Sequence, residues 1–101
     1  MVDTDKEGYL INPEDWTEQV AEELAGREGI TLTDEHWRVL RFMRTYLEDR
    51  QIAPDARHVI KHLAETAGAH RNKLFELFPY GYVQQACKIA GMRRPRAWST
   101  G

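Results

Sequence analysis

Apolar residues recur at helical spacing along most of this chain, and a strand-like segment is confined to its beginning. Residues 6–11 surround Gly8 with a turn-forming pattern and predict a short strand or hairpin. Asn12 and Pro13 then have the residue types of a helix N-cap and a first helical position. The spacing of four that follows predicts a helix from Pro13 to about Gly26. Its apolar face consists of Trp16, Val20 and Leu24.

The rest of the pattern predicts four more helices, over about 33–50, 55–65, 69–77 and 82–90. The helix that begins at Thr33 has apolar residues on more than one narrow stripe, so it is expected to be the most buried. Gly91 ends the last helix, and the residues after it lack helical periodicity. We therefore expect a mainly α fold: a small orthogonal bundle of about five helices with a short N-terminal β element. Residues 1–91 would form this domain, and residues 92–101 a flexible C-terminal arm.

Composition narrows the class of protein. A chain of 101 residues suits one domain, and 42% hydrophobic with 30% charged residues is typical of a globular protein. No apolar run approaches the roughly 20 residues that span a membrane. The acidic N-terminus lacks the apolar core of a signal peptide. Since a single cysteine cannot form an internal disulfide, we expect a protein of the reducing cytoplasm.

Charge is distributed unevenly along the chain. The charged residues of segment 1–28 are mostly acidic, whereas those of segment 66–101 are basic except for Glu76. A positive C-terminal half can steer toward an acidic protein surface or a nucleic acid. Ordinary surface charge explains the same pattern, and the sequence leaves both interpretations open.

Cys87 is the most reactive side chain that the sequence offers, and it lies near the end of the last predicted helix. The dipole at a helix C-terminus disfavours a thiolate. Lys88, Arg93 and Arg94 would offset this effect if the arm folded back. The alternative is that Cys87 is a small buried hydrophobe, which is common for a free cysteine.

Two other patterns suggest sites. The predicted helices 55–65 and 69–77 resemble a helix-turn-helix, which would make the protein a DNA-binding regulator. The base-contacting residues would be His70, Arg71, Asn72 and Lys73. A sequence pI of about 6.1 argues against a dedicated DNA-binding protein.

His58 and His62 are spaced as a metal-binding pair on one helical face. Two histidines are fewer than the ligands that zinc sites use, so no metal site is predicted. No catalytic constellation or phosphate-binding loop can be assigned, and no cofactor is expected.

Five blocks of sequence stand out, in order along the chain. The blocks are Gly8-Tyr9-Leu10 with Asp15-Trp16, Leu32-Thr33-Asp34-Glu35-His36-Trp37, Arg41-Phe42-Met43-Arg44-Thr45-Tyr46, Leu77-Phe78-Pro79-Tyr80-Gly81 and Cys87-Lys88-Ile89-Ala90-Gly91-Met92. In their order and spacing they resemble the DsrC/TusE family, sulfur-relay proteins related to the gamma subunit of dissimilatory sulfite reductase.

The resemblance implies a mechanism in which the arm enters a partner protein. DsrC-type members carry two cysteines on the arm; the first matches Cys87, and the second falls at Trp98. The arm presents the second cysteine to sulfur, and the first then pairs with it. TusE-type members keep only the second cysteine and pass a persulfide toward tRNA thiolation. This chain keeps the first cysteine and lacks the second. The tryptophan at the second position cannot carry a persulfide.

The resemblance therefore implies a sulfur-relay-related protein rather than a stand-alone enzyme. It would carry a persulfide on Cys87, or it would be a non-catalytic binding or regulatory paralogue. Its partner would be a sulfur-transfer or sulfite reductase-type protein, with nucleic acid as the less favoured partner. The partner contact would be made by Lys88, Arg93, Arg94, Arg96 and Trp98.

Overall fold

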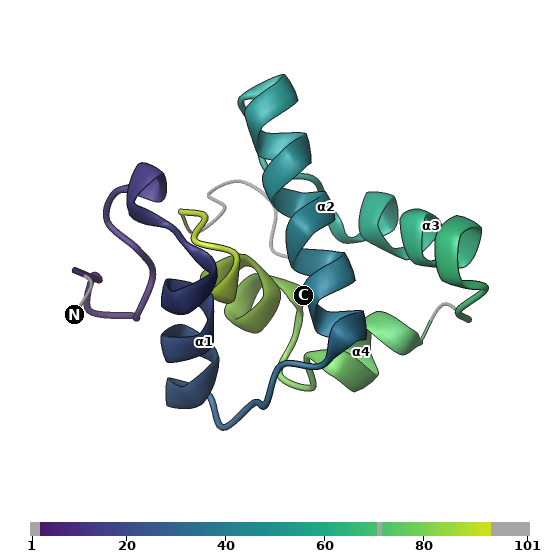
Figure 1. Cartoon of the computed structure of the whole chain (residues 1–101), viewed down its shortest axis with the longest axis horizontal. Coiled ribbons are helices and arrows are strands. Elements are labelled where there is room, and N and C mark those ends of the chain that lie inside the picture. The colour runs from purple at the N-terminus through teal and green to yellow at the C-terminus, as the bar shows by residue number, and fades with distance from the viewer. Residues whose placement is uncertain (1–2, 71, 94–101) are drawn as a thin grey trace.

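The computed structural model describes residues 3–70 and 72–93, which form a helical bundle (Figure 1). The helices are η1 (Pro13–Asp15, a 3₁₀ turn), α1 (Glu18–Arg27), α2 (Asp34–Arg50), α3 (Ala56–Ala67), α4 (Lys73–Leu77) and η2 (Tyr82–Cys87, wound as a π-helix). Helix α3 crosses α2 steeply on one side, and α1 lies on the other, with the segment that begins at η2 in the middle. The expected mainly α fold is confirmed.

The N-terminal β element is smaller than a hairpin. It consists of one isolated antiparallel bridge between Thr4 and Leu10, the only β pairing in the described part of the chain. Gly8 supplies the turn with a φ of 92°, a value that favours glycine. Leu10 is buried at 1% exposure, so the bridge fastens this segment to the core.

The first predicted helix is interrupted, which corrects the prediction of one helix from Pro13 to Gly26. The η1 turn ends at Asp15, Trp16 is extended, and α1 begins only at Glu18. The Thr17 hydroxyl caps α1 by accepting the Val20 amide hydrogen bond at 3.1 Å. Trp16 therefore does not share a helical face with Val20.

Helix α2 matches its prediction from Thr33 to Arg50, and a buried histidine fixes its start. His36 Nδ1 accepts a hydrogen bond from the Thr33 amide at 3.0 Å, and its Nε2 donates to the Leu77 carbonyl at 2.9 Å. The imidazole also packs edge-on against Phe78. Burial lowers the pKa of His36, which favours this neutral, two-sided arrangement. One side chain thus joins the start of α2 to the end of α4.

Helices α3 and α4 are separated by a longer turn than the sequence suggested. Asp55 caps α3 by accepting the His58 amide hydrogen bond at 3.2 Å, and Gly68 ends it with a φ of 64°. Helix α4 begins at Lys73 rather than at residue 69, so it is only five residues long. The prediction of a helix over 69–77 was therefore wrong at its start.

The C-terminal helix ends in a Schellman motif at Gly91. Residues 88–89 continue η2 as an α-helical turn. The Gly91 amide donates to the Lys88 carbonyl at 3.1 Å, and the Met92 amide donates to the Cys87 carbonyl at 3.0 Å. Met92 is 1% exposed, so the first residue of the predicted arm is buried in the core, not exposed. Residues 94–101 lie outside the described part of the chain.

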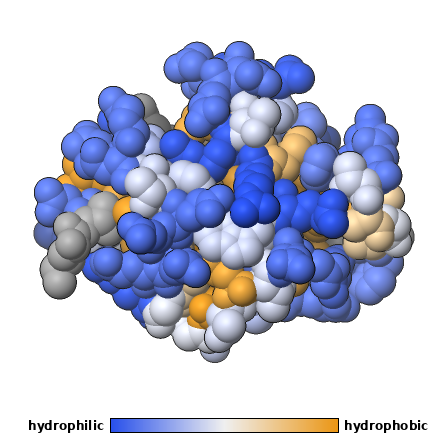
Figure 2. All heavy atoms as spheres, viewed as in Figure 1, coloured by the Kyte–Doolittle hydropathy of each residue, from blue (hydrophilic) through white to orange (hydrophobic). Residues whose placement is uncertain are grey.

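One hydrophobic core includes residues from α1, α2, α3, α4 and the C-terminal helix. Hydrophilic side chains cover most of the face shown in Figure 2, and apolar atoms show only in patches. No helix in the described residues has both the length and the apolar character needed to cross a membrane.

Candidate functional site

Cys87 is enclosed in the core on the last turn of η2. Its exposure is 0%, and Tyr82, on the same element, is equally buried. Burial raises the pKa of the Cys87 thiol to about 12, and the neighbouring Tyr82 hydroxyl opposes this shift only in part. The Tyr82 hydroxyl itself donates to the Pro54 carbonyl. In this conformation Cys87 is a neutral thiol without access to solvent.

Side chains from distant parts of the chain contact η2, which is wound as a π-helix. The Tyr9 hydroxyl donates to the Val83 carbonyl at 2.8 Å. Gln85, 1% exposed, accepts from the Tyr80 amide at 3.0 Å and donates to the Glu28 carboxylate at 3.3 Å. Single π-helical turns occur often at functional sites. Here hydrogen bonds join the thiol-bearing helix to the N-terminal segment and to the end of α1.

Lys88 is directed away from the thiol. Its ammonium lies 3.2 Å from the Glu28 carboxylate and 5.2 Å from the centre of the Tyr9 ring, and its side chain is 15% exposed. Desolvation therefore dominates the Cys87 pKa, and Lys88 does not provide the offset that the sequence suggested. A cleft of about 260 Å³ opens beside Lys88, lined also by Tyr80 and Gln84.

The other predicted partner-binding residues come after residue 91, in the predicted C-terminal arm. Arg93 is exposed at the end of the described chain. Arg94, Arg96 and Trp98 lie outside the described residues, so their contact role stays a prediction.

Sequence reasoning missed a junction at the root of the arm. The Trp16 indole nitrogen donates to the Ile89 carbonyl at 2.9 Å, and Arg44 donates to the Ala90 carbonyl at 3.0 Å. The Arg44 guanidinium also lies 4.8 Å from the centre of the Trp16 ring. The signal was present in the sequence, because Arg44 occupies the inward stripe of α2 beside Leu40 and Met43. An arginine on an apolar stripe requires polar partners in the interior.

Comparison with known proteins identifies the family. The family model described as DsrC like protein matches residues 1–97. The chain belongs to the DsrC family.

Individual members of this family match over nearly the whole chain. Sulfurtransferase TusE of Yersinia pseudotuberculosis is 43% identical over 98 residues, which cover 94% of this chain and 91% of that protein. The oxidized gamma subunit of the dissimilatory sulfite reductase (DsrC) from Archaeoglobus fulgidus superposes with a TM-score of 0.88 at 34% identity, covering 97% and 92% of the two chains. DsrC of Allochromatium vinosum gives a TM-score of 0.83 at 39% identity, covering 97% and 90%. The expectation of a sulfur-relay-related protein of the DsrC/TusE family is confirmed.

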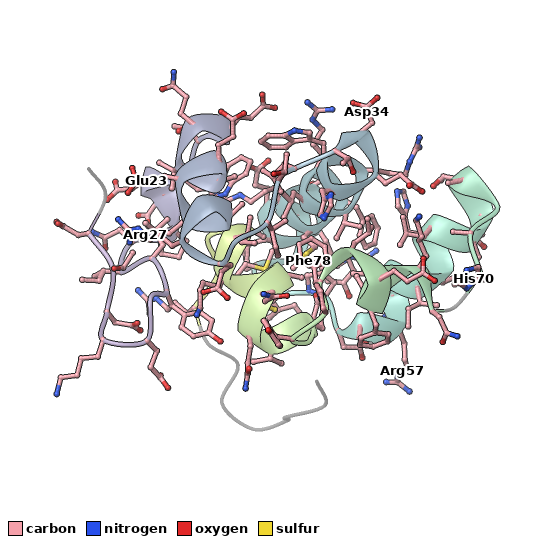
Figure 3. All side chains as sticks on the ribbon, turned by 90° about the horizontal axis from the view of Figure 1, so that it is seen from below. Glu23, Arg27, Asp34, Arg57, His70 and Phe78 are labelled. Carbon is pink, nitrogen blue, oxygen red and sulfur yellow. The ribbon has the colours of Figure 1, made fainter. Side chains whose placement is uncertain are left out.

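The DNA-binding alternative gains no support from the family or from the geometry. Of its four predicted contact residues, His70 and Asn72 precede α4, and Arg71 lies outside the described residues. The Lys73 ammonium lies 3.0 Å from the Glu35 carboxylate, and His70 lies 3.5 Å from that of Glu76. His70 is at the outer edge of the molecule, far from the central Phe78 (Figure 3). Acidic neighbours neutralise the positive charge that phosphate binding would need.

His58 and His62 contact aromatic rings between α2 and α3. The His62 ring stacks on Phe42 with centroids 4.2 Å apart, and His58 lies 5.4 Å from the Tyr46 ring. His58 Nδ1 is also 3.0 Å from the Asp55 carboxylate. Among the residues that the structure describes, no group of three or more His, Cys, Asp or Glu side chains is arranged to hold a metal ion.

Proposed function

We propose that this protein is a sulfur-relay component that binds a sulfur-transfer partner while its single cysteine stays enclosed. One observation carries the proposal: Cys87 is fully buried, and burial raises its pKa to about 12. A thiol accepts or donates sulfur as the thiolate. At neutral pH, such a pKa leaves roughly one molecule in a hundred thousand ionised.

The sequence at the end of the chain also supports a binding role without sulfur carriage by Cys87. The family resemblance assigns the second cysteine of DsrC-type proteins to the position of Trp98, and Cys87 is the only cysteine in the sequence. A protein with this pattern is suited to binding or regulating a relay rather than to carrying sulfur itself. Persulfide carriage by Cys87 is the competing possibility within the family.

The partner is expected to be a sulfur-transfer or sulfite reductase-type protein, in sulfur metabolism or tRNA thiolation. The relatives are named as sulfurtransferase and as the gamma subunit of dissimilatory sulfite reductase, which supports this class. Arg93 is exposed, and Arg94 and Arg96 follow it in the sequence. This cationic segment favours an acidic partner surface.

Exposure to a persulfide donor tests the proposal. The folded protein is treated under conditions that fully load a low-molecular-weight thiol, and its intact mass is then measured. We expect no added sulfur. A gain of one sulfur on Cys87, removed by reductant and absent in Cys87→Ser, would instead establish Cys87 as a carrier.

A further inference from the structure

The carbonyl groups at the end of the Cys87 helix all have partners. Within the motif at Gly91, the Cys87 and Lys88 carbonyls accept the Met92 and Gly91 amides. The next two carbonyls, those of Ile89 and Ala90, have no partner in the helix and are taken by side chains of Trp16 and Arg44. Two of these four carbonyls are therefore bound by side chains that are distant in the sequence.

Arg44 connects three segments of the chain at this point. From α2, its guanidinium donates to Ala90 at 3.0 Å and to the Pro13 carbonyl at 3.1 Å, and it stacks over Trp16. Its Nε is buried and has no hydrogen-bond partner within the described residues. Buried polar groups in folded proteins nearly always have a hydrogen-bond partner. The unpaired Nε lowers the free energy needed to release this guanidinium.

The same junction is connected to the backbone of Cys87. The Trp16 ring fills the space beside Gly91, where a Cβ would lie 2.4 Å from its Cδ1 atom. One residue later, the Met92 amide is bonded to the carbonyl of Cys87 itself. Separation of Trp16 and Arg44 from the helix end would free residues 89–92 and uncover the turn that carries the thiol.

We propose that Trp16 and Arg44 form a latch that holds the last turn of the helix closed over Cys87, and that its release is the route by which the thiol becomes accessible. Both are positioning residues, because they bind backbone carbonyls and not the sulfur. The latch goes beyond the proposed function, since it is a property of the free chain whether or not a partner binds.

The rate at which iodoacetamide alkylates Cys87, measured by mass at increasing urea concentrations, tests the latch. Local opening gives a rate with a shallow urea dependence at low urea, and global unfolding gives a steep one at high urea. For the unmodified protein, we expect an alkylation rate with the shallow urea dependence at low urea. Arg44→Met removes two charge-assisted hydrogen bonds and should raise the low-urea rate by about tenfold or more. Trp16→Phe keeps a ring, removes one donor and should raise it by a smaller factor.

Two control variants separate the latch from general loosening. Arg41→Met makes the same change on the same helix, where the arginine and its partner Glu18 are 62% and 59% exposed, and should leave the rate unchanged. Leu63→Ala removes buried core contacts on α3 and should shift only the steep regime.

Three results would overturn the latch. The first is alkylation of the unmodified protein that follows the steep urea dependence down to zero urea. The second is a rate of Cys87 alkylation at low urea that is unchanged in the latch variants. If Arg44→Met does not fold, the result for Trp16→Phe decides alone. The third is acceleration by Leu63→Ala as large as that by Arg44→Met. Alkylation measures opening of the helix end, and the persulfide experiment measures sulfur loading of Cys87 without urea. Latch opening with no added sulfur leaves both proposals standing, whereas added sulfur on Cys87 overturns the proposed function and leaves the latch standing.

Discussion

Cationic side chains at two places in this protein have opposite environments. At the start of α4, the Lys73 ammonium contacts the Glu35 and Glu76 carboxylates at 3.0 and 3.8 Å, at the surface. At the root of the C-terminal arm, Arg44 has no carboxylate within salt-bridge distance in the described structure and binds carbonyls instead. Accordingly, the hydrogen bond with Glu35 raises the pKa of Lys73, whereas burial lowers that of Arg44.

The comparison shows that the role of a basic residue is indicated mainly by its surroundings in the folded structure. Four polar or basic residues in sequence, 70–73, suggested a DNA contact, yet His70 and Lys73 each lie beside a carboxylate. The sequence pattern assigned no binding role to Arg44, yet this arginine binds the end of the helix that carries the only cysteine. Buried polar contacts are few and must be satisfied, so their loss has larger consequences than the loss of surface pairs.

The largest expected effect comes from filling the space at the arm root. Gly91→Ala places a methyl group against Trp16 at a φ of 75°, and we expect a loss of about 2–4 kcal/mol in the free energy of unfolding. Gly29→Ala is the matched control, because its φ is 72° but nothing lies within 4 Å. It should cost only about 1 kcal/mol. Urea denaturation measures both, and equal losses would mean that contact with Trp16 is unimportant.

A smaller effect is expected from pH at the junction of α2 and α4. The folded-state pKa of His36 is lowered below 6.5, mainly by burial, so the unfolded chain binds its proton first as pH falls. Stability from this residue is present above pH 6.5 and is lost as the pH drops below it, with a slope of at most about 1.4 kcal/mol per pH unit. Urea denaturation between pH 7 and pH 5 should show this decline. His36→Gln should reduce the slope, and an unchanged slope would contradict the assignment.

The smallest effect is expected at the start of α4. Lys73→Ala removes a surface ion pair, and we expect no measurable change in the thermal midpoint or in Cys87 alkylation. A clear loss of stability would show that this cation is as important as Arg44 and would remove the contrast between the two regions.

Local signals in the sequence accounted for most of the helices. The start of α2 at Thr33 and its length were predicted, as were a start of α3 near Asp55 and the end of the last helix at Gly91. The errors occurred where a distant contact overrides local preference. Trp16 leaves the helical pattern to bind Ile89, and the turn after Gly68 delays α4 to Lys73.

The candidate site was predicted only in part. Cys87 was identified from the sequence, but its pattern fitted both an active thiol and a buried hydrophobe. The structure favours burial, because the side chain of Cys87 lies in the core with an exposure of 0%. Lys88 was one of three cations that would favour the thiolate if the arm folded back, yet its ammonium pairs with Glu28, which is distant in the sequence.

The sequence by itself determined the helical class, the main helix boundaries and, through its motifs, membership of the DsrC family. These properties depend on residue types a few positions apart, which set backbone preferences and faces. Only the tertiary structure decided the accessibility of Cys87, the closure of its helix by Trp16 and Arg44, and the pairing of Lys73. Those depend on burial and on contacts between residues far apart in the chain, and both desolvation and hydrogen-bond satisfaction are set by the packed structure.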